Sequence, residues 1–448
     1  MNTLTMKEHE TAAVSERPLA GQLSTTDVID LDRAQRAMGV EAFRWSGRDQ
    51  IKATEQVGMI ATANVRLEIL PKIGGLGIPE TRGALVRMIA IASDLPVWDS
   101  EITGHDHQDR DLLELLIGLF ARRLHQQVRA GLSRSYQQRE DDLSLLRGKL
   151  NVTRQFTKLA ASPQKLACRY DNFTADNGLN RLLLCATTFL RPRTTRTDTQ
   201  RLLSEIISHF EDVSNESVST VLLEPSVIDR IDRRWSIPAR LARLLLSKVY
   251  QTAHSGPHDG IAILFDMNRL FEAYVAAIAR RVCQAHGYAL SVQGPQRYLA
   301  TDAEHEGAFL TRPDLHVDLV ASKVVLDTKW KHLDSARPNF GVTQSDAYQM
   351  LGYALVYQTT STILLYPHHD GLKGRPGVQT AWRFQNIGAT LILATIDVAK
   401  PENAEPTIRR LLAAIMSFTD QLHSTEALED AGIGYTYRRN LLQQVSRP

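Results

Sequence analysis

Two aspartates and a lysine lie at neighbouring ends of two apolar segments. Asp314 directly follows a proline near the start of a run that ends at Val320. Asp327 and Lys329 close a second run, which begins at Val324. Both runs alternate or cluster apolar residues as β-strands do, and only a short segment separates them. The pattern predicts a tight hairpin whose ends bring Asp314 close to Asp327.

These residue types suit metal-assisted hydrolysis of a phosphodiester. Side chains on a strand alternate, so Asp327 and Lys329 point to one face and Thr328 to the other. Two carboxylates held together repel each other, and a hard divalent cation such as Mg²⁺ removes that cost. A lysine beside it orients or deprotonates the attacking water and offsets charge in the transition state. The alternative is two solvated strands with ordinary surface charges, because acid-x-Lys matches are common.

Two predicted helices carry further candidate residues. Residues 264–275 open a long amphipathic helix with Glu272 in its early turns, and residues 346–354 lie on another helix. Gln349 and Tyr353 are four residues apart on the second helix and therefore share a face. The plain alternative is that Glu272 and Gln349 are solvated side chains on helix surfaces.

The order of these features resembles that of a known nuclease core. A helix with an acid, a strand with Pro-Asp, a strand with Asp-x-Lys and a helix with Gln-x-x-x-Tyr follow one another, as in PD-(D/E)xK nucleases of the RecB-like type. Several phrases are more closely similar to the McrC family, the nuclease subunits of McrBC modification-dependent restriction systems. They lie at residues 70–74, 168–181, 264–275, 313–329 and 346–354.

The resemblance implies a role for each candidate side chain. Asp314 and Asp327 would be ligands of Mg²⁺, and Glu272 would be an additional ligand or an acid just behind the ligands. Lys329 would orient the water and stabilise charge. Gln349 would position the substrate or a water on the metal.

The resemblance also implies a substrate and a partner. The substrate would be double-stranded DNA containing methylcytosine, and Tyr353 would contact that DNA or support packing. Members of the family act with a hexameric AAA+ GTPase, McrB, whose hydrolysis they stimulate and which recognises the modified base. Since this chain has no G-x-x-x-x-G-K-[ST] phosphate loop, GTP would be bound by the partner and not by this chain.

Composition places the chain among ordinary globular proteins. Its 448 residues carry a net charge of +2, so a nucleic-acid surface must be a local patch. The three cysteines are far apart and show no zinc or disulfide spacing. No apolar run approaches the roughly 18 residues of a membrane span, and the start of the chain lacks a signal peptide. We therefore expect a cytoplasmic protein with no membrane contact.

The predicted fold class is α/β, or α+β overall, in three segments. Residues 1–27 are polar and without period, which predicts a disordered tail. Residues 28–255 predict a β-plus-helical region, which the resemblance makes the docking region for the AAA+ partner. A Gly- and Pro-containing linker around residues 254–260 then marks a boundary. Residues 256–448 predict the PD-(D/E)xK domain, a mixed sheet flanked by helices.

Three other functions remain open from the sequence. The chain could be a stand-alone RecB-like nuclease with its own specificity. It could be a non-catalytic adaptor that keeps the fold and only activates an AAA+ motor, or a DNA-binding module without chemistry. The presence of all four core motifs in order argues against the last two.

Overall fold

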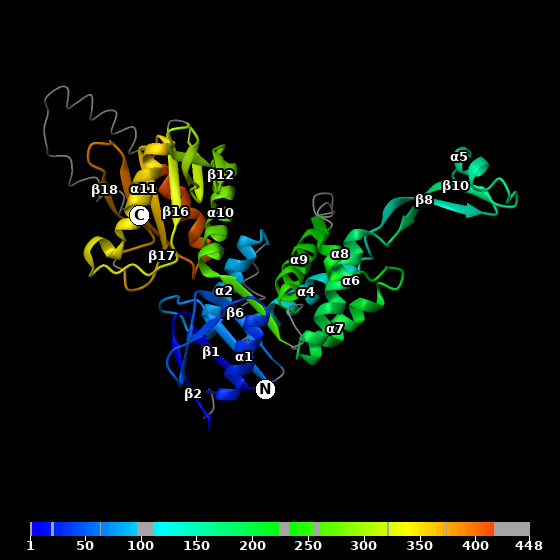
Figure 1. Ribbon diagram of the computed structural model, residues 1–448, viewed down its shortest axis with the longest axis horizontal. Helices are drawn as coiled ribbons and strands as arrows, with labels where there is room; N and C mark the ends of the chain where they lie inside the picture. The colour runs from blue at the N-terminus through cyan, green and yellow to red at the C-terminus, as the bar shows by residue number, and fades with distance from the viewer. Residues whose placement is uncertain are drawn as a thin grey trace.

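Three bodies make up the molecule: an N-terminal sheet domain, a helical bundle with a long arm, and a C-terminal mixed-sheet domain (Figure 1). The computed structural model describes residues 2–18, 22–62, 64–95, 111–223, 233–253, 260–319, 322–372 and 374–415. The strands are β1 (Asn2–Lys7), β2 (Thr11–Ser15), β3 (Leu23–Ser24), β4 (Phe43–Trp45), β5 (Gln50–Ala53), β6 (Gln56–Ala61), β7 (Val65–Leu70), β8 (Ser135–Leu143), β9 (Lys149–Leu150), β10 (Leu166–Thr174), β11 (Ile261–Asp266), β12 (Ala289–Val292), β13 (Arg297–Thr301), β14 (Gly307–Thr311), β15 (Leu315–Asp318), β16 (Lys323–Thr328), β17 (Ser361–Pro367), β18 (Gly377–Arg383) and β19 (Thr390–Ile396).

The helices are α1 (Thr25–Ala37), α2 (Ile78–Ala92), α4 (Leu112–Val128), α5 (Val152–Thr157), α6 (Gly178–Leu190), α7 (Thr197–Ser208), α8 (Val218–Leu223), α9 (Arg233–Ala253), α10 (Met267–His286) and α11 (Gln344–Tyr357). Residues 404–415 are also helical. In the described part of the chain, no helix is both long enough and apolar enough to cross a lipid bilayer.

The N-terminal domain contains a sheet in the order β1-β7-β6-β11 and a second sheet in the order β3-β2-β5-β4. Strand β1 pairs in parallel with β7 over its whole length. The prediction of a disordered tail at residues 1–27 is therefore wrong. Segments 2–7 and 11–15 have little apolar character of their own. They are ordered because they complete sheets with strands far along the chain, which local composition does not reveal.

The helical bundle packs α4, α6, α7, α8 and α9 together, and an arm leaves it between α4 and α6 (Figure 1). The arm is a long antiparallel pair, β8 with β10, extended by β9 and α5 at its outer end. Its base is fixed by Asn177, the N-cap of α6, whose side chain accepts a hydrogen bond from the main-chain N–H of Asn180. The polar residues at this point cap a helix, in agreement with their spacing.

The C-terminal domain is built on a sheet in the order β12-β15-β16-β17-β19-β18. Strands β16, β17 and β19 are parallel, and the others run antiparallel to their neighbours. Alternating residues of β16 face opposite sides of the sheet: Val324 and Leu326 join the core that contains α10, whereas Val325 packs beneath α11. The predicted mixed sheet flanked by helices is confirmed.

The predicted boundary after residue 255 falls among residues 254–259, which lie outside the described residues. The strand that follows, β11, pairs antiparallel with β6 and so belongs to the N-terminal sheet. Gly58 makes this close pairing feasible, because a Cβ there would lie 1.9 Å from the carbonyl oxygen of Ile263. The expected helical start at residue 264 is therefore wrong: α10 begins at Met267, capped by Asp266.

Candidate active site

The predicted hairpin exists and brings the two motif aspartates together. Strands β15 and β16 pair antiparallel in the register that sets Leu315 opposite Leu326. One residue further along, this register puts Asp314 at the level of Asp327. Thr328 then fixes Asp314, since its main-chain N–H and its hydroxyl each donate to Asp314 Oδ2 at 2.7 Å.

Lys329 connects the strand pair to helix α11. Its Nζ lies 2.6 Å from Asp327 Oδ2 and donates to Gln349 Oε1 at 3.0 Å. Gln349 Nε2 in turn donates to the hydroxyl of Tyr353 at 2.9 Å, and that hydroxyl donates to the carbonyl oxygen of Arg312 at 3.2 Å. The chain of contacts returns to the residues just before Asp314, so the two strands and the helix hold one constellation.

Asp346 also belongs to this constellation, and the sequence analysis did not single it out. It lies in the first turn of α11, capped by Thr343, and is almost buried. Its carboxylate oxygens are 3.9 Å from Lys329 Nζ and 3.6 Å from Lys331 Nζ. The spacing Thr343-x-x-Asp346 is a helix-start signal and was visible in the sequence, but its proximity to Lys329 depends on the tertiary fold.

Glu272 stands beside the constellation and not within it. Its Oε1 accepts a hydrogen bond from Gln293 Nε2 at 2.8 Å, and the main-chain N–H of Gln293 donates to the carbonyl oxygen of Asp314 at 2.7 Å. Within the described ranges, no three His, Cys, Asp or Glu side chains are grouped closely enough to form a ready-made metal site. A role for Glu272 as a ligand stays a prediction.

The site is largely buried, and its carboxylates outnumber the lysines beside them. Burial, and then the charge of Asp314, raise the pKa of Asp327 to about 6, although Lys329 acts in the opposite direction. Burial works to lower the pKa of Lys329, but Asp327 and Asp346 outweigh it and the pKa is raised. Burial also raises the pKa of Glu272, with a contribution from Asp314. The carboxylates around Lys329 therefore favour its protonated form.

The carboxylates fit a hard divalent cation. Asp327 Oδ2 is buried and, despite the nearby ammonium, has no well-directed hydrogen bond. Within the described residues, Asp314 uses Oδ2 for both of its side-chain hydrogen bonds, which leaves Oδ1 available. Mg²⁺ takes one or two carboxylates and keeps several waters, so Asp314 and Asp327 together satisfy its needs without a third side chain.

Two kinds of comparison with known proteins give matches. A family model described as "McrBC 5-methylcytosine restriction system component" matches residues 51–367, well over half of the chain. A search of curated proteins finds no match. Among solved structures, the chain is similar to one from the assembly of Thermococcus gammatolerans McrB AAA+ hexamers with bound McrC. That match has 21% identity and a TM-score of 0.67, and it covers 92% of this chain and 100% of that one.

A second match is to the cryo-EM structure of the Thermococcus gammatolerans McrBC complex, with 23% identity, a TM-score of 0.47 and coverage of 63% of this chain and 88% of that one. The first structural match supports the fold described above. The family match spans the strands and helices that carry Asp314, Asp327, Lys329 and Gln349. This chain therefore belongs to the McrBC 5-methylcytosine restriction system component family.

Proposed function

We propose that this chain is the metal-dependent endonuclease subunit of a McrBC-type complex, with a PD-(D/E)xK active site that cleaves methylcytosine-containing DNA. The observation that carries the proposal is the convergence of Asp314, Asp327, Lys329 and Gln349 at the ends of two paired strands and one helix. Family membership supports a role in restriction, and the electrostatics support a bound cation.

Each side chain has a task that its surroundings suit. Asp314 and Asp327 would hold Mg²⁺, which supplies Lewis-acid stabilisation of the phosphate when bound. Lys329 would orient the attacking water and offset negative charge on the phosphate, a role that suits an ammonium whose pKa is raised by its carboxylate neighbours. Gln349 holds Lys329 in place through its side-chain oxygen at 3.0 Å.

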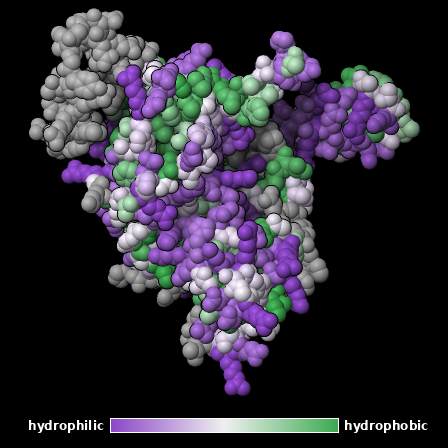
Figure 2. All heavy atoms as spheres, turned by 60° about the vertical axis from the view of Figure 1, so that its left-hand side comes forward, coloured by the Kyte–Doolittle hydropathy of each residue, from purple (hydrophilic) through white to green (hydrophobic). Residues whose placement is uncertain are grey.

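The partner in this proposal is an AAA+ GTPase hexamer of the McrB type, which binds GTP. The solved relative from Thermococcus gammatolerans is described as McrC bound to McrB hexamers. In the present chain, the arm offers a surface for such a partner. Its outer end carries Leu145, Leu146, Val152 and Phe156, each more than half exposed. Figure 2 shows hydrophobic residues at the end of this otherwise hydrophilic projection.

The test is a cleavage assay on methylated and unmethylated DNA with Mg²⁺, GTP and the hexameric partner. Asp314→Asn and Lys329→Ala are expected to lower the cleavage rate roughly a hundredfold or more. The first weakens the site for Mg²⁺, and the second removes positive charge at the reacting phosphate. Stimulation of the partner's GTPase should persist in both. The matched controls are Asp318→Asn and Lys323→Ala, which change the same residue types at the opposite, exposed end of the same hairpin.

The other candidate functions predict different outcomes. Cleavage by the isolated chain with Mg²⁺ alone would favour a stand-alone nuclease. GTPase stimulation and restriction that are unaffected by Asp314→Asn would favour a non-catalytic adaptor. Equal effects of the variants at both ends of the hairpin would contradict the assigned active site.

A further inference from the structure

Trp330, which directly follows Lys329, connects the end of strand β16 to the N-terminal domain. Strand β16 ends at Thr328, and the main-chain N–H of Lys329 makes one more bond to Leu365 O, at 2.9 Å. Beyond that point the Trp330 side chain anchors the segment. Its indole N–H donates to Glu8 Oε1 at 2.8 Å, and its ring meets that of Phe271 edge-on, with 5.3 Å between centroids.

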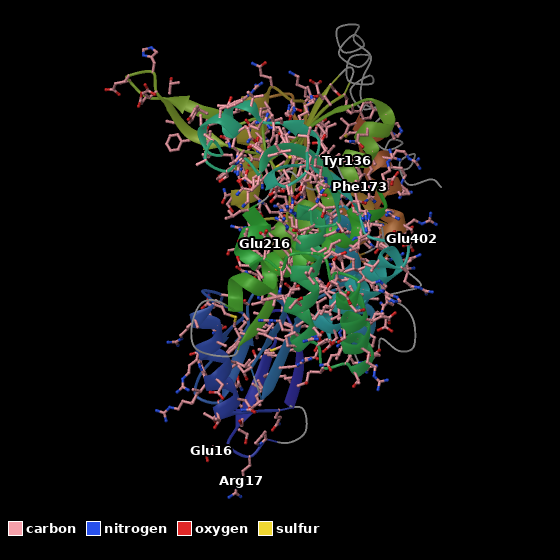
Figure 3. All side chains as sticks on the ribbon, turned by 90° about the vertical axis from the view of Figure 1, so that its right-hand side faces the viewer. Glu16, Arg17, Tyr136, Phe173, Glu216 and Glu402 are labelled. Carbon is pink, nitrogen blue, oxygen red and sulfur yellow. The ribbon has the colours of Figure 1, made fainter. Side chains whose placement is uncertain are left out.

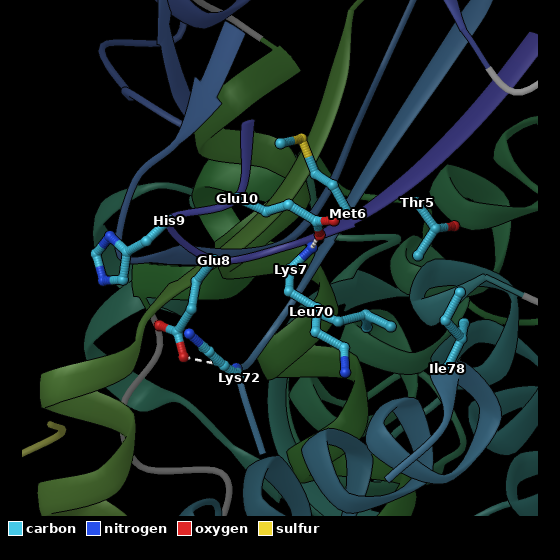
Figure 4. Close-up of a pocket in the computed structure, with 9 residues that line it drawn as sticks. All are labelled: Thr5, Met6, Lys7, Glu8, His9, Glu10, Leu70, Lys72 and Ile78. Carbon is cyan, nitrogen blue, oxygen red and sulfur yellow. Dashed lines mark hydrogen bonds between the residues drawn. The ribbon is translucent and has the colours of Figure 1, made fainter. Parts of the chain in front are cut away.

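Glu8 is itself held rigidly at the end of β1. Its side chain is only 3% exposed, and its main-chain N–H donates to Leu70 O at 2.8 Å. Oε1 accepts a second hydrogen bond, from the main-chain N–H of Lys72 at 2.7 Å (Figure 4). The carbonyl oxygen of Lys72 is bonded in turn to His332 Nε2 at 2.7 Å. Two contacts from the N-terminal sheet thus bracket the segment that follows Lys329.

We propose that Glu8 is a positioning residue that couples the N-terminal sheet to Lys329 through Trp330. The inference rests on the proposed nuclease function and deepens it, because it names a residue outside the active site on which the rate of cutting depends. Glu8 lies outside residues 51–367, to which the family model matches.

The geometry gives the coupling a physical basis. Trp330 follows Lys329 directly, so a shift of the indole moves the backbone that aims the ammonium at Asp327. The same ring packs on Phe271, which precedes Glu272 on α10. One side chain therefore links Glu8 to the strand that carries Asp327 and to the helix that carries Glu272. A displacement of about 1 Å at a reacting group can cost roughly a hundredfold in rate.

If Glu8 served only to hold the two domains together, an apolar side chain would be sufficient in its place. Glu8 Oε2 is buried and has no hydrogen-bond partner among the described residues, and burial raises the pKa of Glu8 despite the two donors on Oε1. A buried carboxylate with one unused oxygen costs stability, whereas apolar side chains would join the two domains more cheaply. The carboxylate is explained by what Oε1 holds, which is the indole N–H and the Lys72 loop.

The experiment compares substitutions in the full chain, assembled with the hexamer, Mg²⁺ and GTP. Glu8→Leu removes the acceptor, Trp330→Phe keeps the ring and removes the donor, and Glu8→Gln keeps an oxygen in place of Oε1. Glu10→Ala is the control. Glu10 lines the same cavity of about 470 Å³, but among the described residues its side chain accepts a hydrogen bond from the main-chain N–H of Lys7 alone (Figure 4).

The expected result is a loss in kcat of about tenfold or more for Glu8→Leu and Trp330→Phe, with KM for DNA and GTPase stimulation nearly unchanged. Glu8→Gln should restore most of the rate. The double variant Glu8→Leu with Trp330→Phe should be no slower than Glu8→Leu alone, since Glu8→Leu already removes the contact that Trp330→Phe breaks. Wild-type rates in both single variants would overturn the proposal. So would a loss that appears equally in KM and complex assembly, which would indicate a structural role.

Two further measurements separate this proposal from the assignment of the nuclease. If Asp327→Asn cleaves DNA as fast as wild type, the assigned active site is wrong. The Glu8–Trp330 contact is then tested separately, by fluorescence. For that, the Trp330 signal is taken as the difference between each background and its Trp330→Phe counterpart. In wild type the indole should be shielded from acrylamide, and in Glu8→Leu it should be quenched more readily. Equal quenching would show that Glu8 does not hold Trp330, and the proposal would fail on that ground alone.

Discussion

At the scale of single residues, Lys329 is the centre of the site because it is shared. Asp327 is its nearest carboxylate at 2.6 Å, Asp346 lies 3.9 Å away, and Gln349 accepts its hydrogen bond. These contacts approach the ammonium from a strand and from a helix, which restricts its side chain far more than one ion pair would. Preorganisation of this kind is what allows a lysine to stabilise charge without rearranging.

Asp346→Asn tests the carboxylate that the sequence analysis did not single out. Losing its charge loosens Lys329 and Lys331 together while Asp314 and Asp327 remain, so the cleavage rate should fall about tenfold with DNA affinity retained. Single-turnover cleavage together with a DNA-binding titration checks this. Asp334→Asn is the control, since Asp334 is an exposed loop acid bonded to Ala336 N and Arg337. A larger effect in the control would contradict the role of Asp346.

Sequence alone reached the residues whose proximity follows from local geometry. Asp314 meets Asp327 because a hairpin closes on itself, and Asp327 shares a face with Lys329 because side chains on a strand alternate. Gln349 contacts Tyr353 through helical spacing. Asp346, Gln293 and Glu8 escaped prediction because their contacts join elements far apart in the chain, where no period or spacing gives a signal.

At the scale of elements, an ion-pair network braces the base of the arm. Arg181 in α6 binds Asp176 at 2.7 Å and Glu216 at 2.8 Å, and Ser214 also donates to Asp176. The rings of Tyr136 and Phe173, from the two arm strands, lie 4.8 Å apart just beyond (Figure 3). The arm is therefore anchored to the helical bundle by polar contacts at its root.

Asp176→Asn should destabilise this root in a way that depends on pH. The Arg181 hydrogen bonds lower the pKa of Asp176 to about 2, against the effect of burial. A lowered pKa in the folded state stabilises the protein at any pH above the unfolded value, and that stabilisation is lost as the pH falls through the folded value. The expected loss in free energy of unfolding is roughly 1–2 kcal/mol.

Thermal unfolding of wild type and variant from pH 7 downward measures this difference. The gap should be constant between pH 7 and about pH 5 and should close only below about pH 4. Asp171→Asn, at an exposed position on the adjacent strand β10, should show no such gap. A gap that already narrows between pH 7 and pH 5 would rule out Asp176 as its source.

At the scale of the whole molecule, the exposed end of the arm lies far from the candidate active site, in a separate body (Figure 1). If it docks on the hexamer, Phe156→Ser and Leu146→Ser should abolish co-elution with the partner and GTPase stimulation. The chain itself should stay folded, because both side chains are more than half exposed and removing them leaves no cavity. Size-exclusion chromatography of the mixture and thermal unfolding of the chain alone measure the two effects.

Tyr136→Ser is the control for the arm, because Tyr136 is as exposed as Phe156, at 74%, but lies at the arm's root. Complex formation by the two outer variants at wild-type level would show that another surface binds the partner.

The division of the chain into halves was the part least accessible from sequence. The Gly- and Pro-containing segment at residues 254–260 has every mark of a linker. However, β6 pairs with β11, which lies about two hundred residues further along the chain, and β1 joins the same sheet from the first residues of the sequence. Apolar residues of that sheet, of α2 and of α10 form one continuous core with one face of the C-terminal sheet.

Strand β11 is joined by the chain to the C-terminal domain, but its pairing with β6 makes it part of the N-terminal sheet. A peptide bond broken between Ala253 and Gly260 would leave both products joined along a full ladder of main-chain hydrogen bonds. Conversely, a gene fragment starting at residue 256 would carry one strand of a sheet whose other members it lacks, and this raw edge invites aggregation. Any exchange of the C-terminal domain between relatives of this chain would have to splice at the start of α10, directly after strand β11 ends.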